Sequence, residues 1–346
     1  MRVIIAGGGT GGHLYPGVAI AEKLSKLSIE PLFIVSNRGI ERNILTPLGY
    51  KFIEQKESPL KSVSFLRKIE SVQNILGNIV SSIKIIKKDD IVVLLGGFAS
   101  FSAGVAAIIR RNPIFIHEQN SVMGLSNRIF SKVARKIFLS FENSCKSKKA
   151  VFVGNPVRSV FRNLDPKSSP DKRILLTGGS QGSRFLNNLF VPIAQELIND
   201  GYSIIHQTGE KLYDEVINDY DKYGIKSGNL IVKRYIDDMG EAIKWADLVI
   251  SRAGAGSIYE IMYSKRYGIF IPFAGATDNH QEINAKLPVE KGIGVSIKEK
   301  IATPEVLLGE IKRFYNDFDI INKRFQDIKF MDSAEIMIKE MGFANV

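Results

Sequence analysis

The sequence predicts an α/β protein in which two similar domains each contain a doubly wound parallel sheet. Short apolar segments rich in β-branched residues alternate with segments of helical periodicity along the chain, a pattern typical of parallel sheets covered by helices. The alternation begins again near residue 173, where a second apolar segment leads into a second glycine-rich turn. A chain of 346 residues is long enough for about two domains, each with its own core.

The individual elements follow from the apolar spacing. A strand is predicted at residues 3–6, directly before the first glycine-rich turn, and a helix at 16–27, where apolar residues recur at helical spacing. Residues 173–183 repeat the design of strand, glycine-rich turn and helix. A last helical pattern at 333–341 is compatible with packing on either domain. The remaining predicted strands are residues 32–35, 91–95, 114–117, 203–206, 230–232, 248–250 and 269–271.

The linker is predicted near residues 154–158 or in the polar segment 165–171. We therefore expect an N-terminal domain at 1–157 and a C-terminal domain at 158–346, each Rossmann-like. The N-terminal half contains 22 Lys and Arg and 10 Asp and Glu, whereas the C-terminal half contains 25 and 26. The net charge of +11 thus lies in the N-terminal half. That half is expected to attract an anionic partner, such as nucleic acid, a phosphate-bearing substrate or an acidic membrane surface.

Composition excludes several kinds of protein. The single cysteine, Cys145, cannot form an intramolecular disulfide, and four histidines leave little room for a His/Cys metal site. A reducing, cytoplasmic setting without a secretory signal is expected. The uncharged stretch 91–109 is interpreted as a strand, a glycine turn and a buried helix rather than a membrane span, because glycines and serines interrupt it. No D-x-D, G-x-S-x-G or G-x-x-x-x-G-K-[ST] motif occurs, so neither a metal nor a cofactor is expected.

The first glycine-rich loop satisfies G-x-G-x-x-G through Gly7, Gly9 and Gly12. A dinucleotide-binding loop also needs an acid at the end of the second strand, to hold the adenine ribose. No acid follows that strand here. Arg38 is suited to the 2′-phosphate of NADP, so NADP is not excluded, but dinucleotide binding at this loop is disfavoured. His13 at the end of the loop is either a helix cap or core histidine, or a functional group. Its position at the carboxyl edge of the sheet favours function.

Three further polar motifs follow predicted strands. Residues 117–121 contain His-Glu but have Ser121 where a zinc helix needs a second histidine, so they form either a hydrogen-bonded turn or a ligand contact. Residues 251–260 open a helix with a glycine turn that can receive phosphate, and Glu260 is suited to a ribose diol or is a solvated helix residue. Residues 278–281 supply polar side chains that suit sugar hydroxyls.

Seven motifs in order resemble one family over nearly the whole chain. They are Gly8-Gly-Thr-Gly-Gly-His13, His117-Glu-Gln-Asn120, Gly154-Asn-Pro-Val-Arg158, Gly178-Gly-Ser-Gln-Gly182, Ile236-Asp-Asp-Met239, Ser251-Arg-Ala-Gly254 through Glu260, and Asp278-Asn-His-Gln281 followed by Asn284-Ala285. Each motif is weak alone, but together they resemble the MurG family of bacterial transferases. That family transfers N-acetylglucosamine (GlcNAc) from UDP-GlcNAc to a lipid-linked N-acetylmuramyl-pentapeptide.

The resemblance implies a GT-B fold, in which two Rossmann-like domains face each other across a cleft. It implies that the second domain mainly binds the donor and the first the acceptor. The implied reaction is inverting, metal-independent transfer of GlcNAc to the C4 hydroxyl of undecaprenyl-diphosphate-linked MurNAc-pentapeptide, the step from lipid I to lipid II in peptidoglycan synthesis. The implied location is the cytoplasmic face of the bacterial membrane, as a peripheral protein.

The resemblance also implies site residues by position. His13 is the candidate general base, because a histidine titrates near working pH; a weaker role, positioning the acceptor while water takes the proton, stays open. The implied substrate-binding residues are Thr10, Gly11 and Gly12 beside the donor sugar and acceptor diphosphate, Asn120 and Gln281 at GlcNAc, Arg158, Ser180 and Gln181 at the nucleotide or its diphosphate, the Ile236 backbone at uracil, Ala255, Gly256 and Ser257 at the departing UDP, and Glu260 at the ribose. Phe98 departs from some relatives, which have tyrosine, so a hydroxyl contact to the acceptor is in doubt.

The resemblance gives the basic first half a partner, an anionic membrane. Residues 65–88 have apolar residues at helical spacing, flanked by Lys84, Lys87 and Lys88. They are interpreted either as a basic amphipathic face in the lipid interface or as core-facing helices. Other function classes remain alternatives: a glycosyltransferase with a soluble acceptor, or a dinucleotide-binding protein. Nucleic-acid binding is not expected, because the basic residues are not interleaved with aromatics in a recognised module.

Overall fold

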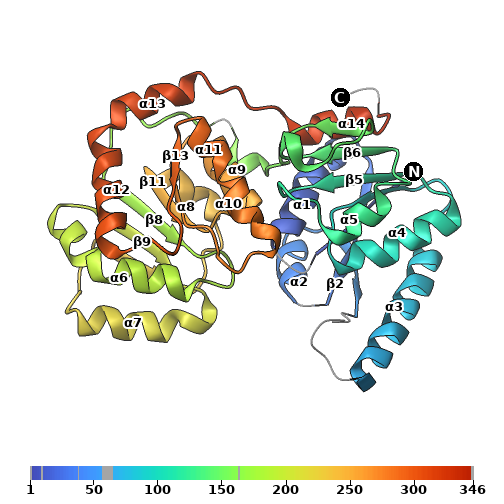
Figure 1. The fold of residues 1–346 in the computed structure, drawn as a ribbon. Coiled ribbons are helices and arrows are strands. Elements are labelled where there is room, and N and C mark those ends of the chain that lie inside the picture. The colour runs from blue at the N-terminus through green and yellow to red at the C-terminus, as the bar shows by residue number, and fades with distance from the viewer. Residues whose placement is uncertain (1, 9–10, 38, 57–64, 163, 344–346) are drawn as a thin grey trace. The chain divides into compact units, whose positions relative to one another are not determined.

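The computed structural model describes residues 2–8, 11–37, 39–56, 65–162 and 164–343. The chain divides into two compact units, one of Met1–Ser159 together with Met331–Val346 and one of Val160–Phe330. Each unit contains one parallel sheet with helices on its faces (Figure 1). The predicted fold class, two α/β domains with parallel sheets, is confirmed.

The sheet of the first unit has seven strands in the order β3-β2-β1-β4-β5-β6-β7. The direction of strand succession reverses between β1 and β4, and open α/β sheets bind ligands at the carboxyl ends of the strands beside such a point. The strands are β1 Arg2–Ala6, β2 Glu30–Ser36, β3 Lys51–Gln55, β4 Ile91–Leu94, β5 Ile114–Glu118, β6 Lys136–Leu139 and β7 Ala150–Phe152.

Both faces of this sheet are buried, because successive residues of a strand point to opposite faces. Val3 and Ile5 belong to a core that includes Met337 of the last helix, whereas Ile4 belongs to a second core that includes Ala103. The helices of this unit are α1 Gly11–Lys26, α2 Ile40–Leu45, α3 Phe65–Ile85, α4 Phe98–Arg110, α5 Leu125–Phe130 and α14 Ser333–Glu340, with the 3-10 helices η1 Glu142–Ser144 and η2 Ser159–Phe161, the latter crossing the unit boundary.

The last helix, α14, packs on α1 of the first unit. Lys23 of α1 forms ion pairs with Asp332, at 2.7 Å, and with Glu335, at 3.3 Å. Lys136 pairs with Glu340. The buried side chains Met337 and Ile338 add apolar contacts to the same core as Val3. The chain therefore returns to the first unit after completing the second.

The second unit repeats the strand order, with six strands arranged β10-β9-β8-β11-β12-β13. The reversal lies between β8 and β11, and the second glycine-rich turn follows β8. The strands are β8 Arg173–Thr177, β9 Ser203–Gln207, β10 Leu230–Lys233, β11 Leu248–Ser251, β12 Tyr267–Phe270 and β13 Gly294–Ser296. The helices are α6 Arg184–Asn199, α7 Tyr213–Lys222, α8 Met239–Trp245, α9 Ala255–Tyr263, α10 His280–Asn284, α11 Lys286–Glu290, α12 Pro304–Asn316 and α13 Phe318–Gln326, with the 3-10 helices η3 Glu210–Leu212 and η4 Thr277–Asn279.

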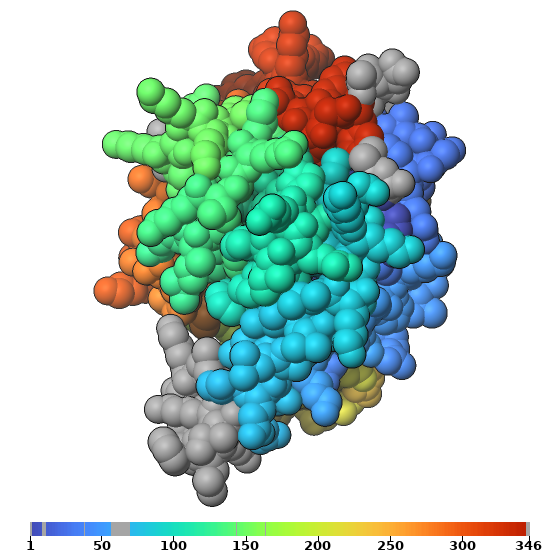
Figure 2. Space-filling view, turned by 90° about the vertical axis from the view of Figure 1, so that its right-hand side faces the viewer, coloured from blue at the N-terminus to red at the C-terminus, as the bar shows by residue number. Residues whose placement is uncertain are grey.

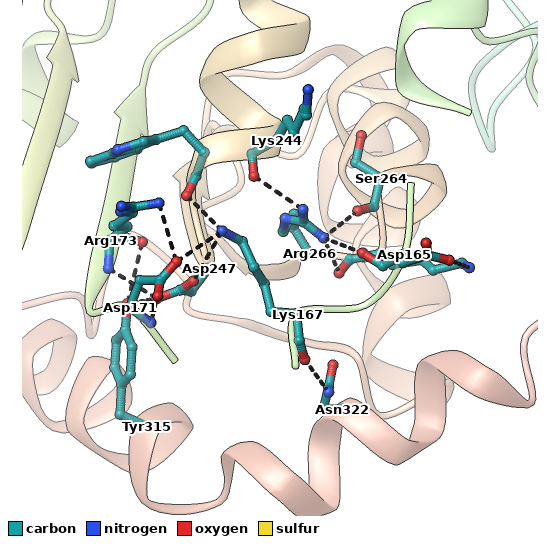
Figure 3. Close-up of polar contacts among 12 residues, drawn as sticks. Asp165, Lys167, Asp171, Arg173, Lys244, Asp247, Ser264, Arg266, Tyr315 and Asn322 are labelled. Carbon is teal, nitrogen blue, oxygen red and sulfur yellow. Dashed lines mark hydrogen bonds and ion pairs between the residues drawn. The ribbon is translucent and has the colours of Figure 1, made fainter. Parts of the chain in front are cut away.

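A buried polar cluster fixes the chain at the amino ends of β8 and β11 (Figure 3). The carboxylate of Asp247 accepts hydrogen bonds from the backbone N–H groups of Asp171, at 2.8 Å, and Arg173, at 3.0 Å. Lys167 lies 3.8 Å from the same carboxylate. Burial raises the pKa of Asp247. These contacts lie at the edge of the sheet opposite the glycine-rich turn, so we interpret them as structural.

Arg266 completes this cluster by binding backbone carbonyls (Figure 3). Its guanidinium donates to the carbonyls of Asp165, Ser264 and Lys244 at 3.0, 2.8 and 3.0 Å. Burial lowers the pKa of Arg266. Lys244 is in α8 and Ser264 follows α9, whereas Asp165 lies in the segment before β8. The Arg266 side chain therefore connects the segment before β8 to the ends of two helices.

Differences from the predicted elements have local causes. The first helix begins at Gly11 and not at Pro16, because the glycine-rich segment before the proline is already helical. Strands β3, β7 and β13 escaped prediction; they are short edge strands with partly exposed residues, so their apolar signal is weak. Strand β6 lies inside the sheet and also escaped prediction, because it has only four residues. In the described part of the chain, no helix combines the length and apolar character needed to span a membrane.

Candidate active site

Two glycine loops meet at the carboxyl edge of the first sheet, beside the reversal point. Gly8 and Gly97 have φ values of 148° and 81°, a region open mainly to glycine. A Cβ on Gly97 would lie 2.7 Å from the carbonyl oxygen of Gly8. The loops after β1 and β4 therefore touch backbone to backbone, and only glycine fits between them.

His13 lies in the first turn of α1, against one of these loops. The position that a Cβ of Gly96 would occupy is 3.4 Å from Cδ2 and 3.6 Å from Nε2 of the His13 ring. Gly11 and Gly12 are the first residues of α1, whose N-terminus favours anions. Thr10 lies outside the described residues.

The motif at residues 117–121 forms a hydrogen-bonded turn after β5. The buried carboxylate of Glu118 accepts from the N–H groups of Asn120, at 3.0 Å, and Gly124, at 2.9 Å, and from Nδ2 of Asn127, at 2.9 Å. Burial lowers the pKa of His117 to about 3. Glu118 thus shapes the loop that presents the half-buried Asn120.

Asn127 is a residue that the sequence analysis missed. Its Nδ2 atom lies 3.4 Å from the same Cβ position of Gly96 that His13 approaches. It also donates to the carbonyl of His117, at 3.2 Å. Asn127 therefore connects the loop carrying Asn120 with the surroundings of His13.

Arg158 lies at the end of the first unit, over the ring of Tyr15. Its Cζ atom is 4.1 Å from the ring centroid, a cation–π distance. Tyr15 was not singled out from the sequence, because nothing local marks it as a partner of a residue so far along the chain.

In the second unit, the loop after β8 packs closely against the loop after β9. Gly182 has a φ of 73° and Gly209 a φ of 89°. A Cβ on Gly209 would lie 2.5 Å from the carbonyl oxygen of Gln181. Ser180 is half-buried and Gln181 is exposed. The loop precedes α6, whose first turn is capped by the Ser183 hydroxyl, which accepts from Leu186 N–H at 3.3 Å.

Gln207 joins this loop to the segment after β10. It is buried, its Oε1 atom accepts from the N–H of Ile236 at 2.8 Å, and its Nε2 atom donates to Thr177 Oγ1 at 3.1 Å and to the carbonyl of Gly179 at 2.9 Å. Because the N–H of Ile236 is hydrogen-bonded to Gln207, we expect the carbonyl of Ile236 to be the group that contacts a nucleobase. Gln207 was not predicted from the sequence.

The start of α9 follows β11 at the same edge of the second sheet. The N-cap residue of α9 is Gly254, which has no side chain to accept hydrogen bonds from the first backbone N–H groups of the helix. Ala255 is buried, whereas Gly256, Ser257 and Glu260 are half-buried. This geometry suits an anion at the helix start.

Two further side chains complete this region. Arg252 donates to Ser183 Oγ at 3.1 Å and forms an ion pair with Glu299 at 2.6 Å; its burial lowers its pKa. The side-chain oxygen of Gln281 accepts from the N–H of Phe273 at 2.9 Å. This bond orients the amide so that its NH2 group is the end left to donate to a ligand.

Comparison with known proteins identifies the family. Residues 3–139 match the glycosyltransferase family 28 N-terminal domain, and residues 173–329 match the family 28 C-terminal domain. A UDP-N-acetylglucosamine–N-acetylmuramyl-(pentapeptide) pyrophosphoryl-undecaprenol N-acetylglucosamine transferase from Syntrophus aciditrophicus is 40% identical, covering 91% of this chain and 90% of that protein. A relative of the same name from Geotalea daltonii is 36% identical, covering 99% and 97%. The chain belongs to this transferase family.

A solved structure agrees with this assignment. The crystal structure of MurG from Acinetobacter baumannii has a TM-score of 0.75 and 25% identity, covering 98% of each chain. The predicted MurG family is therefore confirmed, and the chain is a glycosyltransferase.

In this MurG-family chain, the structure groups the predicted residues within each unit. Gly11, Gly12, His13, Asn120 and Arg158 lie in segments that follow the carboxyl ends of strands or open α1 in the first unit. The predicted residues of the second unit also follow its strands at their carboxyl ends; they are Ser180, Gln181, Ile236, Ala255, Gly256, Ser257, Glu260 and Gln281. Among the residues described, no group of three or more His, Cys, Asp or Glu is placed to hold a metal ion.

Proposed function

We propose that the chain transfers GlcNAc from UDP-GlcNAc to the C4 hydroxyl of undecaprenyl-diphosphate-linked MurNAc-pentapeptide, converting lipid I to lipid II in peptidoglycan synthesis. The observation that carries this proposal is 40% identity, over 91% of the chain, to a relative named for that transfer. The two glycine-rich loops and the start of α9 support it, because helix N-termini and closely approaching backbones suit diphosphate groups.

In the proposed reaction, the acceptor C4 oxygen attacks C1 of GlcNAc while the bond from C1 to the UDP oxygen breaks. His13 takes the proton of the C4 hydroxyl, and the bond electrons leave with UDP. A single displacement inverts the configuration at C1. The half-exposed position of His13 at the N-terminus of α1 supports this role, because a base must reach the hydroxyl directly.

On the donor side, the residues take roles that their geometry suits. The Ile236 carbonyl accepts from uracil N3–H, since its own N–H is bonded to Gln207. Glu260 accepts from the ribose hydroxyls. We assign Ser180, Gln181 and Arg158 to the nucleotide or its diphosphate. Ala255, Gly256 and Ser257 stabilise the departing UDP through the start of α9. Asn120 and the Gln281 NH2 group contact GlcNAc. Gly11 and Gly12, together with Thr10, which lies outside the described residues, are assigned to the sugar and the acceptor diphosphate.

We propose that this charge stabilisation needs no metal ion. In this proposal, the preorganised N–H dipoles at the start of α9 stabilise developing charge on the leaving group, a task that a bound cation performs in other enzymes. Turnover is expected to be unchanged by EDTA. Loss of turnover in EDTA that added Mg²⁺ restores would contradict this part of the proposal.

An exposed apolar stripe on α3 supports an anionic membrane surface as partner. Val72, Leu76 and Val80 recur every four residues and are 51%, 57% and 52% exposed. Figure 2 shows α3 in cyan on one face of the first unit, next to α4, with which it packs. Lys84, close to the end of α3, and Lys87 and Lys88, just after it, are exposed on the same segment. Such a basic amphipathic surface suits the lipid interface, and we propose peripheral binding at the cytoplasmic face.

Vesicle flotation tests this surface. Changing Lys84, Lys87 and Lys88 together to Glu should weaken binding to vesicles that contain anionic phospholipid, while zwitterionic vesicles bind little in either case. The matched control reverses three exposed lysines of the second unit, Lys211, Lys226 and Lys300. Equal losses in both triple variants would show that only net charge matters.

Product analysis tests the reaction itself. Purified chain should convert UDP-GlcNAc and lipid-linked MurNAc-pentapeptide to UDP and a disaccharide lipid, and NMR should show the anomeric configuration opposite to that of the donor. Transfer only to water-soluble acceptors would contradict the proposed acceptor. Retained configuration would contradict the single displacement.

A further inference from the structure

The ring of Tyr15 supports the guanidinium of Arg158. Cζ of Arg158 lies 4.1 Å from the ring centroid, well inside the range of an attractive cation–π contact. Tyr15 follows His13 by two residues in α1, and residues two apart on a helix point to different sides. The first turns of α1 thus direct His13 toward Gly96 and Tyr15 toward Arg158.

The backbone around Arg158 is already fixed to the first unit. Val157 is buried, Asn155 is buried and its Oδ1 accepts from Ser140 Oγ at 3.1 Å, and the N–H of Ser159 donates to Glu22 Oε2 at 3.0 Å. Glu22 is also in α1. The backbone of Arg158 is therefore held in place by these contacts.

Stacking on a ring restricts the Arg158 side chain without occupying its donors. At 4.1 Å from the ring centroid, the guanidinium is close enough to stack its face on the ring of Tyr15, and its N–H bonds, which lie in its plane, take no part in such a stack. The edges of the plane can then form paired hydrogen bonds to phosphate oxygens, the arrangement that arginine favours.

We propose that Tyr15 is a positioning residue that holds Arg158 in the orientation that binds the donor diphosphate. This inference rests on the proposed function, in which Arg158 binds the nucleotide or its diphosphate. Tyr15 itself does not touch the reacting atoms. It acts through Arg158, from the same helix that carries the proposed base.

Binding of UDP measures the effect without chemistry. In isothermal titration calorimetry, Tyr15→Leu should weaken UDP binding by about 5- to 30-fold, the loss expected for one cation–π contact. Tyr15→Phe keeps the ring and should stay within about twofold of wild type. In transfer assays, KM for UDP-GlcNAc should rise in Tyr15→Leu more than kcat falls.

A double-mutant cycle separates positioning from a structural role. Tyr15→Leu added to Arg158→Gln should cause no further loss of UDP affinity, because its partner is already gone. Additive losses would overturn the inference, as would a lowered melting temperature of Tyr15→Leu with unchanged UDP affinity. If Arg158→Gln leaves UDP affinity unchanged, this inference and the Arg158 assignment both fail, while lipid-linked product from the wild-type chain would still support the proposed reaction.

Discussion

Substituting Gly182 by alanine should separate steric close approach from backbone strain in the donor loop. Gly182 has a φ of 73°, and an added Cβ would overlap the carbonyl of Thr208 and lie 2.8 Å from Cα of Gly209. Both neighbours are backbone, so no flexible side chain can move away. Gly179 in the same loop has a φ of 79° but no atom within 4 Å of its Cβ position. The two alanine variants share the backbone cost and differ in the collision.

The expected magnitudes follow from these two positions. A left-handed conformation costs a non-glycine residue about 1–2 kcal/mol, and this is the whole expected cost of Gly179→Ala. Gly182→Ala must also displace Thr208, whose carbonyl accepts from Nδ2 of Asn187 at 3.2 Å. Losing a buried hydrogen bond adds about 1–3 kcal/mol, so about 2–5 kcal/mol is expected for Gly182→Ala.

Denaturant unfolding of the second unit and UDP titration are the assays. Gly182→Ala should lose more stability and more UDP affinity than Gly179→Ala. Equal effects on stability would refute the argument that the loops after β8 and β9 need backbone contact. Normal UDP affinity in a stable Gly182→Ala variant would refute the assignment of this loop to the donor.

Three further changes test other parts of the structure. His117 and His206 are buried with pKa values lowered to about 3. Because the unfolded chain takes up these protons near pH 6.5, the stability contributed by each neutral histidine should be full above that pH and should fall by about 2 kcal/mol between about pH 7 and pH 5 in denaturant titrations, with the slope approaching about 1.4 kcal/mol per pH unit only well below pH 6.5. A free energy of unfolding that rises as the pH is lowered over that range would contradict the buried neutral state of these histidines. Gln207→Glu should cost the second unit about 1–3 kcal/mol in thermal unfolding and weaken UDP binding, since a carboxylate cannot donate to Gly179; unchanged UDP affinity would argue against the role of Gln207. Asp247→Leu should destabilise the second unit by about 3 kcal/mol, with Asp247→Asn less affected because it keeps an acceptor; equal effects would show that the acceptor is unimportant.

The sequence predicted the architecture well, because strands followed by glycine turns carry a strong local signal. It placed most strands within a residue or two, and the seven ordered motifs predicted the family. It missed the start of α1 and the short strands β3, β6, β7 and β13, whose pairing depends on neighbours elsewhere in the sheet.

The missed site residues share one cause. Tyr15, Asn127 and Gln207 act through contacts with segments distant in the chain: Tyr15 meets Arg158, Asn127 meets the surroundings of Gly96, and Gln207 meets Ile236. No local spacing marks such partners. The roles of His13 and the substrate-binding residues stay predictions.

The most direct test of the account is turnover in His13→Ala and His13→Gln, measured with UDP affinity on the same preparations. The account predicts that turnover falls by about 10²- to 10⁴-fold in both variants, the contribution typical of a general base, while UDP affinity stays near that of the wild type. Turnover close to wild type in either variant would contradict the assignment of His13 as the base.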